Sequence, residues 1–321
     1  TVDFDEKIME ELKQKIDSYL LSAYPEPEPL YDNLSKYLNI ENDELFITAG
    51  SDLAIKTVFE VFISENDEVL IHQPSYAMSS IYCSLFNAKK VSIPFSDNLK
   101  LNLNKFCEKI TNQTRLVIFE NPNGFVGRGF SLDQIIKIIK KAKDEDALIL
   151  IDEAYYPFHD QTAINLINNF DNLIISRTFS KSMALAGVRI GYLISNKKMI
   201  NNLSKFRPMH EISSLASVIG CFFVDHIHLL DNFINDVKKE MSLTVCKLQD
   251  LGFEAHETDA NFILVKIPQT KSDENFQDLM RMNGFLVRRP FNEGFLNGLV
   301  RIGIGSHDQM DSLIKIIKNN F

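Results

Sequence analysis

The sequence lacks the features of several large protein classes. Its 321 residues include only four cysteines, Cys83, Cys107, Cys221 and Cys246, which are widely scattered and form no CxxC pair. This pattern is typical of reduced thiols in a cytoplasmic protein and argues against both a disulfide framework and a cysteine-based metal site. No apolar run approaches the ~20 residues that a membrane span needs, so we expect no membrane segment.

The chain also lacks an excess of positive charge. Lys and Arg number 34 against 43 Asp and Glu, which gives a formal net charge of −9. Nucleic-acid-binding proteins need a basic surface, so we expect no nucleic-acid partner and favour small-molecule chemistry. No GxGxxG or GxxxxGK[ST] segment is present to support a dinucleotide or P-loop site. His210-Glu211 does not continue into a zinc-binding helix, because position 214 is Ser, and we expect no metal.

Continuous apolar runs separated by helical patterns predict the fold class. Residues 116–119, 148–151 and 173–175 are apolar throughout, and an amphipathic helix is predicted over 131–146. Such runs are typical of parallel strands that are buried on both faces. We therefore predict an α/β protein with a mostly parallel sheet covered by helices on both faces, followed by a small C-terminal α/β domain.

The predicted domain division assigns residues 35–237 to the large domain. Residues 1–34 and 238–321 are assigned to the small domain with an N-terminal arm. In the arm, a helix is predicted over residues 4–21 from the helical spacing of apolar residues. These apolar residues are Ile8, Leu12, Ile16 and Leu20, and prolines at 25, 27 and 29 then predict an extended segment.

Polar residues follow several of the predicted strands. Asp152 comes directly after one apolar run, and Lys181 lies in a polar turn after another. Gly50 and Ser51 form a turn that opens a helix, where free N–H groups bind phosphate, although a simple Ser N-cap is the alternative. In parallel sheets ligands collect beyond the carboxyl ends of the strands. The sequence therefore predicts one ligand site formed by these turns and the 120–127 loop.

The motifs of the chain, taken together, resemble a known family. They are AYPEPEP, TAGSDLAI, QPSYAM, ENPNGFVG, LILIDEAYYPF, RTFSKSMALAGVRIGY, DANFIL and LVRIGIGS, in this order from about residue 20 to 306. The set resembles the fold-type I pyridoxal-phosphate enzymes of the aminotransferase superfamily, and within it the histidinol-phosphate aminotransferase branch. The resemblance implies an aspartate aminotransferase-like fold with a seven-stranded sheet, pyridoxal 5′-phosphate as cofactor, and a homodimer.

The resemblance also implies catalytic roles. Lys181 would bind the cofactor aldehyde covalently and then move a proton as general base and acid. Asp152 would keep the pyridine nitrogen protonated; a loop-capping acid is the alternative. Tyr155 would hydrogen-bond the phenolic oxygen, with an interior tyrosine as the alternative.

Further residues would hold the cofactor and the substrate. Tyr76 would stack on the cofactor ring, although core packing explains it equally well. Arg301 would bind the substrate carboxylate as a bidentate partner. Tyr24 would reach across a dimer to the partner's cofactor phosphate and substrate, or else be a surface tyrosine. The phosphate itself would be held by Gly50, Ser51, Asp52, Thr178, Ser180 and Arg189.

One loop departs from the family pattern. Relatives carry Asn-Asn-Pro-Thr-Gly there, and the second Asn binds the ring oxygen. In this chain that position is Gly124, which has no side-chain amide, so more of the contact would fall on Tyr155. Asn123 is the remaining candidate in the loop. Arg288 and Arg289 would add charge for a phosphorylated or dicarboxylic substrate, with a solvated basic pair as the alternative.

Three functions stay open at this point. The first is an aminotransferase that moves an amino group from glutamate or a similar donor to a small phosphorylated keto compound. The second is a decarboxylase of a phosphorylated hydroxy-amino acid, since the bond that breaks depends on which Cα substituent stands perpendicular to the cofactor ring. The third is a non-catalytic binding or regulatory protein, which Gly124 suggests and Lys181 argues against.

Overall fold

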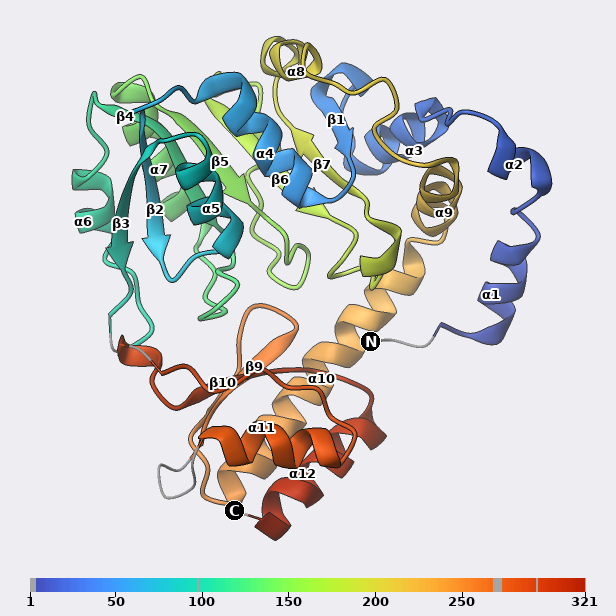
Figure 1. Ribbon diagram of the computed structural model, residues 1–321, viewed down its shortest axis with the longest axis vertical. Helices are drawn as coiled ribbons and strands as arrows, with labels where there is room; N and C mark the ends of the chain where they lie inside the picture. The colour runs from blue at the N-terminus through green and yellow to red at the C-terminus, as the bar shows by residue number, and fades with distance from the viewer. Residues whose placement is uncertain (1–3, 97, 268–272, 293, 321) are drawn as a thin grey trace.

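A sheet of seven strands organises the larger part of the molecule (Figure 1). The structure is a computed structural model that describes residues 4–96, 98–267, 273–292 and 294–320. The strand order is β1-β7-β6-β5-β4-β2-β3, and β7 runs antiparallel to both its neighbours while β2 to β6 are parallel. The strands are β1 (Leu45–Thr48), β2 (Glu68–Gln73), β3 (Lys89–Pro94), β4 (Thr114–Glu120), β5 (Leu148–Asp152), β6 (Leu173–Thr178) and β7 (Gly191–Ile194). The predicted mostly parallel sheet is confirmed.

Helices bury both faces of this sheet. Alternate residues of a strand point to opposite faces, so β5 contributes Ile149 and Ile151 to one core and Leu150 to the other. This is why the strands read as continuous apolar runs. One face packs against α4 (Ser51–Phe62), α5 (Ala77–Leu85) and α8 (Lys197–Ser204), and the other against α3 (Glu28–Leu38), α6 (Leu103–Glu108), α7 (Leu132–Asp144) and α9 (Ser214–Asp225).

A smaller domain lies beyond the carboxyl ends of the parallel strands of the large sheet. It contains an antiparallel sheet of β8 (Ala255–His256), β9 (Phe262–Lys266) and β10 (Leu299–Gly303), with α11 (Asp273–Met282) and α12 (His307–Asn320). The long helix α10 (His228–Asp250) runs from the large domain into the small one (Figure 1). The arrowheads of β2 and β3 point toward the small domain, so the carboxyl ends of the parallel strands face it.

Helices α9 and α10, which meet at the domain junction, contain apolar stretches. Within the residues that the structure describes, no single helix has the length and apolar composition of a membrane span. Helices α9 and α10 satisfy that test only jointly, and they are bent by 76° relative to each other. Much of α9 is instead buried against the large sheet, including Ala216, Phe222 and Phe223.

The N-terminal arm differs from its predicted form. The helix expected over 4–21 is divided into α1 (Glu6–Lys13) and α2 (Ser18–Ser22), because Asp17 accepts a hydrogen bond from the N–H of Leu20 and starts a new helix. The next helix, α3, packs against α9 and β1. The boundaries of the domain division stay a prediction, but residues 28–34 share the core of the large sheet rather than that of the small domain.

Two strands of the sheet had no clear sequence pattern. The edge strand β3 is mostly exposed and carries two lysines at its start, which hides its apolar face. The four-residue strand β7 follows the Lys181 turn and lies between β1 and β6. A close approach requires glycine at its first position, because a Cβ on Gly191 would lie 2.2 Å from the backbone nitrogen of Ser51. This approach brings β7 against the start of α4.

Candidate functional site

The carboxyl ends of the parallel strands bring the predicted site residues together. Strand β5 ends at Asp152, and its neighbour β6 ends at Thr178, just before the turn that holds Lys181. The turn between β1 and α4 lies beside β7, so Gly50 reaches the same edge. Three segments that are about 30 to 130 residues apart in the chain therefore form one site because parallel strands end at a common edge.

Lys181 is held in a turn that lowers its affinity for a proton. The turn is anchored by Phe179, which is buried and whose N–H donates to the carbonyl of Ile190. The Lys181 ammonium lies 5.3 Å from the centre of the Tyr155 ring. Burial lowers the pKa of Lys181, and the guanidinium groups of Arg301 and Arg288 lower it further, against the opposing charge of Asp152. A lysine in this environment is prepared to act as a nucleophile or base.

Asp152 is a buried acid with a raised pKa. Its carboxylate accepts a hydrogen bond of 2.7 Å from the Ser176 hydroxyl on the adjacent strand. Burial raises the pKa of Asp152 to about 7, and the negative charge of Glu120 adds to the effect. The protonated and ionised forms of this acid are therefore close in free energy near neutral pH, and a cationic group bound beside it would favour the ionised form.

A group of hydrogen-bond donors suited to an anion, the anion cup, lies at the start of α4. Gly50 precedes the helix with a φ of +86°, which leaves the N–H groups of Ser51 and Asp52 in the first turn free of helical partners. The Arg189 guanidinium donates to the Ser180 hydroxyl at 3.2 Å, and Ser180 in turn contacts the Thr178 hydroxyl. Glycine is favoured at position 50 by the positive φ, and a Cβ there would also lie 2.5 Å from a nitrogen of Arg189, which would have to shift. Arg189 also lies 3.5 Å from the Asp52 carboxylate.

Two tyrosines border the site. Tyr155 is buried, and its pKa is raised by burial and, in part, by the charges of Glu120 and Asp152. Tyr76 is part-exposed at the start of α5, and its hydroxyl donates to the Asp52 carboxylate. Burial and this hydrogen bond raise the pKa of Tyr76 as well. Both rings are therefore neutral hydrogen-bond donors at physiological pH.

Arg301 extends from the small domain toward the site. It lies in the middle of β10, paired with Leu264 of β9, and its guanidinium donates to the Gly124 carbonyl. The rings of Phe262 and Phe125 lie 5.1 and 5.8 Å from the guanidinium carbon. Burial lowers the pKa of Arg301, although it stays charged. A part-buried guanidinium between aromatic rings is suited to binding a planar carboxylate.

Asn123 is oriented away from its predicted use. Its amide nitrogen donates to the Pro74 carbonyl at 2.9 Å, and its amide oxygen accepts from the N–H groups of Phe125 and Val126. The side chain is fully buried. These bonds shape the 121–127 loop from within and leave Gly124, not Asn123, beside the Tyr155 ring.

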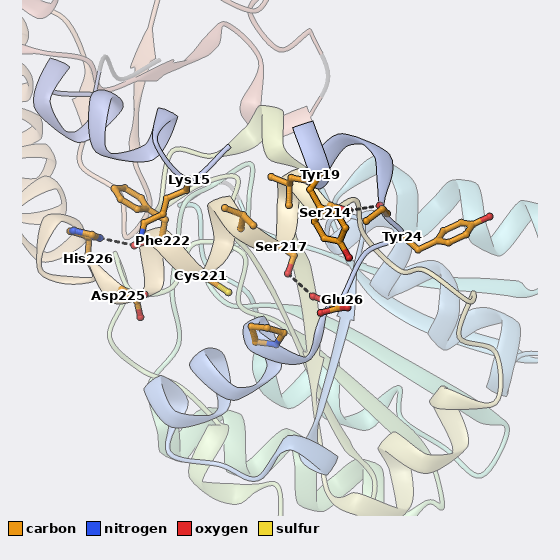
Figure 2. A pocket seen from close by; sticks show the side chains of 14 residues that line it. Lys15, Tyr19, Tyr24, Glu26, Ser214, Ser217, Cys221, Phe222, Asp225 and His226 are labelled. Carbon is orange, nitrogen blue, oxygen red and sulfur yellow. Dashed lines mark hydrogen bonds between the residues drawn. The ribbon is translucent and has the colours of Figure 1, made fainter. Parts of the chain in front are cut away.

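Tyr24 lies apart from the other predicted residues. It is 80% exposed and stacks on His210, with ring centroids 4.7 Å apart. Figure 2 shows it at the rim of a pocket of about 370 Å³ between the N-terminal arm and α9. Hydrogen bonds from Ser214 to the Ala23 carbonyl and from Ser217 to the Glu26 carbonyl hold the arm there. Within one chain, Tyr24 therefore faces solvent.

An acid at the centre of the site, Glu120, was not predicted from the sequence. Glu120 ends β4 and is the register partner of Asp152 on β5. It is 3% exposed, and its carboxylate accepts four hydrogen bonds from neighbouring loops. The signal was present in the sequence, because Glu120 follows an apolar run just as Asp152 does.

A buried ion pair behind the site was also missed. A guanidinium nitrogen of Arg177 lies 2.8 Å from a carboxylate oxygen of Glu153. The two side chains are 4% and 0% exposed. Glu153 also accepts from the Thr162 hydroxyl and from the N–H of Ala163, and the Arg177 guanidinium stacks 3.7 Å from the Tyr156 ring. The pair joins β6 to the loop after β5, which contains Tyr155. Its only sequence signal is a charged residue next to each predicted site residue.

The geometry combines an amine of low proton affinity, buried carboxylates, an anion cup and a guanidinium. The sequence profile of the family described as aminotransferase class I and II matches residues 4–317. The histidinol-phosphate aminotransferase of Thermoanaerobacter pseudethanolicus is 31% identical over 320 residues, which cover 98% of this chain and 89% of that protein.

Two solved structures share the fold over nearly the whole chain. Histidinol-phosphate aminotransferase from Sinorhizobium meliloti, in complex with pyridoxal-5′-phosphate, has a TM-score of 0.86 at 20% identity and covers 98% of this chain and 88% of that one. L-threonine-O-3-phosphate decarboxylase from Porphyromonas gingivalis has a TM-score of 0.83 at 21% identity and covers 99% of this chain and 96% of that one.

The family profile spans both domains and every site residue described above, from Tyr24 to Arg301. The similarity to the Thermoanaerobacter enzyme is likewise almost complete in length. The resemblance that the motifs predicted is therefore confirmed: the chain belongs to the aminotransferase class I and II family.

Proposed function

We propose that this protein is a pyridoxal-phosphate-dependent aminotransferase that moves an amino group from glutamate or a similar donor to a small phosphorylated keto compound. The observation that carries the proposal is Lys181, a half-buried lysine of lowered pKa at the same sheet edge as Asp152 and the anion cup. The relatives named histidinol-phosphate aminotransferase support a phosphorylated substrate.

The residues present fit pyridoxal phosphate. The glycine turn before α4, together with Arg189 and Ser180, offers N–H and guanidinium donors for the phosphate. Asp152 is a buried acid that forms no ion pair with a lysine or arginine in the part of the chain that the structure describes, and it suits a protonated pyridine nitrogen. Tyr76 would lie against the ring, and the Tyr155 hydroxyl would donate to its phenolic oxygen. Asn123 we assign to the shape of the loop rather than to the cofactor.

The residues of this chain divide the reaction among them. When bound, the cofactor supplies an electron sink for the bonds at the substrate Cα. Lys181 would remove the Cα proton, since its lowered pKa favours the uncharged amine. Asp152 holds the proton at the ring nitrogen, and Arg301 orients the substrate through its carboxylate.

A second guanidinium supports the choice of a phosphorylated acceptor. Arg288 is exposed, yet its charge acts on Lys181, Tyr155 and Arg301. Together, Arg288 and Arg301 provide more positive charge than one carboxylate requires, and guanidinium groups bind phosphate oxygens well. We therefore assign Arg288 to the phosphate or second acid group of the substrate.

The test is a half-reaction followed by absorbance. Purified protein loaded with pyridoxal phosphate and mixed with glutamate should convert the bound cofactor to its pyridoxamine form and release 2-oxoglutarate. A series of phosphorylated keto compounds should then reverse the spectrum. If no amino donor changes the spectrum of the loaded protein, the proposal is wrong.

The decarboxylase remains a second candidate because of a specific likeness. The Porphyromonas structure named L-threonine-O-3-phosphate decarboxylase shares the fold over 99% of this chain. Incubation with phosphothreonine or phosphoserine, with carbon dioxide as the readout, separates the two reactions. Carbon dioxide release without 2-oxoglutarate formation from glutamate would identify the decarboxylase.

We also propose a homodimer in the cytoplasm. The N-terminal arm exposes Tyr19 (71%), Leu21 (68%) and Tyr24 (80%), which would be covered by a second subunit. The four cysteines are unpaired, as expected in a reducing compartment. Light scattering should give twice the 36.7 kDa of one chain, and a monomer that retains full activity would exclude a role for Tyr24 in the partner's site.

Replacing Arg301 with glutamine is expected to weaken the use of glutamate. Loss of a charged hydrogen-bonding pair costs roughly 1.5–3 kcal/mol, so kcat/KM for glutamate should fall about 10- to 150-fold. Arg115→Gln is the matched control, since Arg115 lies at the amino end of β4 and donates to the Phe62 carbonyl. Equal kinetics for both variants would contradict a substrate role for Arg301.

Replacing Asp152 with asparagine is expected to change how stability depends on pH in cofactor-stripped protein. The pKa of Asp152 is raised from 3.8 to about 7, so its contribution to stability is present below pH ~4 and lost as pH rises through 7. Asparagine lacks this loss. The Tm of Asp152→Asn relative to wild type should therefore rise between pH 5 and pH 8.

The control for this measurement is Asp311→Asn. The Lys247 ammonium lowers the pKa of Asp311 below its usual value of 3.8, so its contribution to stability is lost only at acid pH, and the Tm of Asp311→Asn relative to wild type should stay level between pH 5 and pH 8. A parallel trend in both variants would show that the Asp152 effect does not come from its raised pKa.

A further inference from the structure

Glu120 is a buried acid that ties two loops together. It ends β4, beside Asp152 on β5, and is 3% exposed. One carboxylate oxygen accepts from the Ser75 hydroxyl at 2.7 Å and from the N–H of Tyr76 at 2.6 Å. The other accepts from the Asn123 amide at 3.2 Å and from the N–H of Gly124 at 2.9 Å.

These four donors come from two separate segments. Ser75 and Tyr76 follow β2, and Asn123 and Gly124 follow β4. A carboxylate has about four acceptor positions, so this one is filled by neutral donors from both segments. In the part of the chain that the structure describes, no lysine or arginine nitrogen lies within 4.0 Å of it as an ion-pair partner. The hydrogen bonds to the Glu120 carboxylate therefore come from neutral groups of these two segments.

The Glu120 carboxylate borders the space beside the Tyr155 hydroxyl. A Cβ built on Gly124 would lie 3.4 Å from a Glu120 oxygen and 3.7 Å from the Tyr155 hydroxyl oxygen. The charge of Glu120 raises the pKa of Asp152, Tyr155 and Arg301. One buried carboxylate thus acts on three groups of the site at once.

We infer that Glu120 is a positioning residue for the cofactor: its carboxylate holds Tyr76 and the 121–127 loop at fixed places and adds negative charge beside Asp152. The inference rests on the proposed function, in which pyridoxal phosphate binds between these elements. Glu120 acts through the loops and through its field, and it transfers no proton.

The negative charge of Glu120 shifts the pKa of nearby groups in one direction. A fixed anion stabilises the protonated form of every group near it, so removing the anion lowers their pKa. A cofactor bound here would titrate between two sets of charged groups, with the hydroxyls of Tyr76 and Tyr155 nearby. The acids are Glu120, Asp152 and Asp52, and the cationic residues are Lys181, Arg301 and Arg288. Loss of one anion from this set shifts the balance toward the deprotonated form of the cofactor.

The test uses Glu120→Gln in the loaded enzyme. The variant keeps the size of the side chain but loses the charge, and its amide nitrogen replaces one of the two oxygens that accept hydrogen bonds from the loops. The pH midpoint of the cofactor's visible absorbance should fall by roughly one unit, and the dissociation constant for pyridoxal phosphate should rise about tenfold. An unchanged midpoint together with an unchanged dissociation constant would overturn the inference.

Glu120→Asp separates the effect of the negative charge from that of the hydrogen bonds to the two loops. It keeps the anion, but the shorter side chain cannot contact both loops, so the dissociation constant should rise while the midpoint stays. Glu44→Gln is the matched control: Glu44 is also buried, accepts from Asn168 and the N–H of Glu41, and lies at the amino end of β1. If the Glu120 variants resemble Glu44→Gln, with lower Tm only, Glu120 has a purely structural role.

A replacement variant and a wild-type binding measurement complete the test. If Glu120→Gln does not fold, Ser75→Ala replaces it, since it removes one donor and leaves the charge; an unchanged dissociation constant would then overturn the inference. If wild-type protein itself binds no pyridoxal phosphate, the proposed function fails, which differs from a loaded wild type whose Glu120 variants are normal.

Discussion

Lys181→Ala is expected to reduce kcat for glutamate by on the order of 10⁴-fold, because the chain loses its proton-transfer group at Cα. No other amine can replace it easily, since the neighbouring positive groups are the guanidinium groups of Arg301 and Arg288, which do not act as bases. The measurement is single-turnover conversion of the bound cofactor by glutamate.

Lys181→Ala should lose activity without losing stability. Burial already disfavours the Lys181 cation, so its removal should leave the Tm unchanged or higher. A small primary amine added to the solution should restore part of the rate. The control is Lys56→Ala on α4, where the lysine pairs with Glu60 on an exposed surface. Retention of the wild-type rate in Lys181→Ala would contradict the assignment of the proton-transfer group.

Arg177→Met is expected to have the largest effect on stability. It leaves the Glu153 carboxylate buried without its cation, which costs about 3–5 kcal/mol, and the Tm should fall by roughly 4–8 °C for a chain of this length. The loop after β5 depends on the same carboxylate through Thr162 and Ala163, so the position of Tyr155 should also become less fixed. Thermal unfolding followed by circular dichroism checks the expectation.

A double variant distinguishes the buried charge from lost packing. In Glu153→Gln/Arg177→Met no charge remains, so a large part of the Tm loss should be recovered. Lys197→Met is the surface control, because its pair with Asp43 is well exposed and should contribute nothing measurable. A double variant with a lower Tm than Arg177→Met would contradict this explanation. It would show that the packing of Arg177 against the Tyr156 ring, rather than the buried charge, stabilises this region.

Much of the site could be predicted from local patterns. Asp152 and Lys181 each follow an apolar strand, and Gly50 precedes a helix directly after another strand. These patterns depend on neighbours in the chain, and the rule that parallel strands end at a common edge then places them together. Arg301 was identifiable for a similar reason, as a cation inside an otherwise apolar strand.

Other features could not be predicted because they depend on partners far apart in the chain. The donors to Glu120 include Ser75 and Tyr76, which are 45 and 44 residues away, and they meet it only because β2 and β4 are adjacent. The break between α1 and α2 has a different cause, since the capping of a new turn by Asp17 overrides a good helical spacing.

The sequence by itself determined the α/β class, the large parallel sheet and which strand ends carry the chemistry, because alternation, apolar runs and turn residues act over short distances. Only the tertiary structure decided where the charges are compensated. It pairs Glu153 with Arg177, directs the Asn123 amide into its own loop and leaves Glu120 with four neutral donors beside Asp152. The physical reason is that the free energy of a buried charge is set by its neighbours in space, and for these residues most of those neighbours come from other strands and loops.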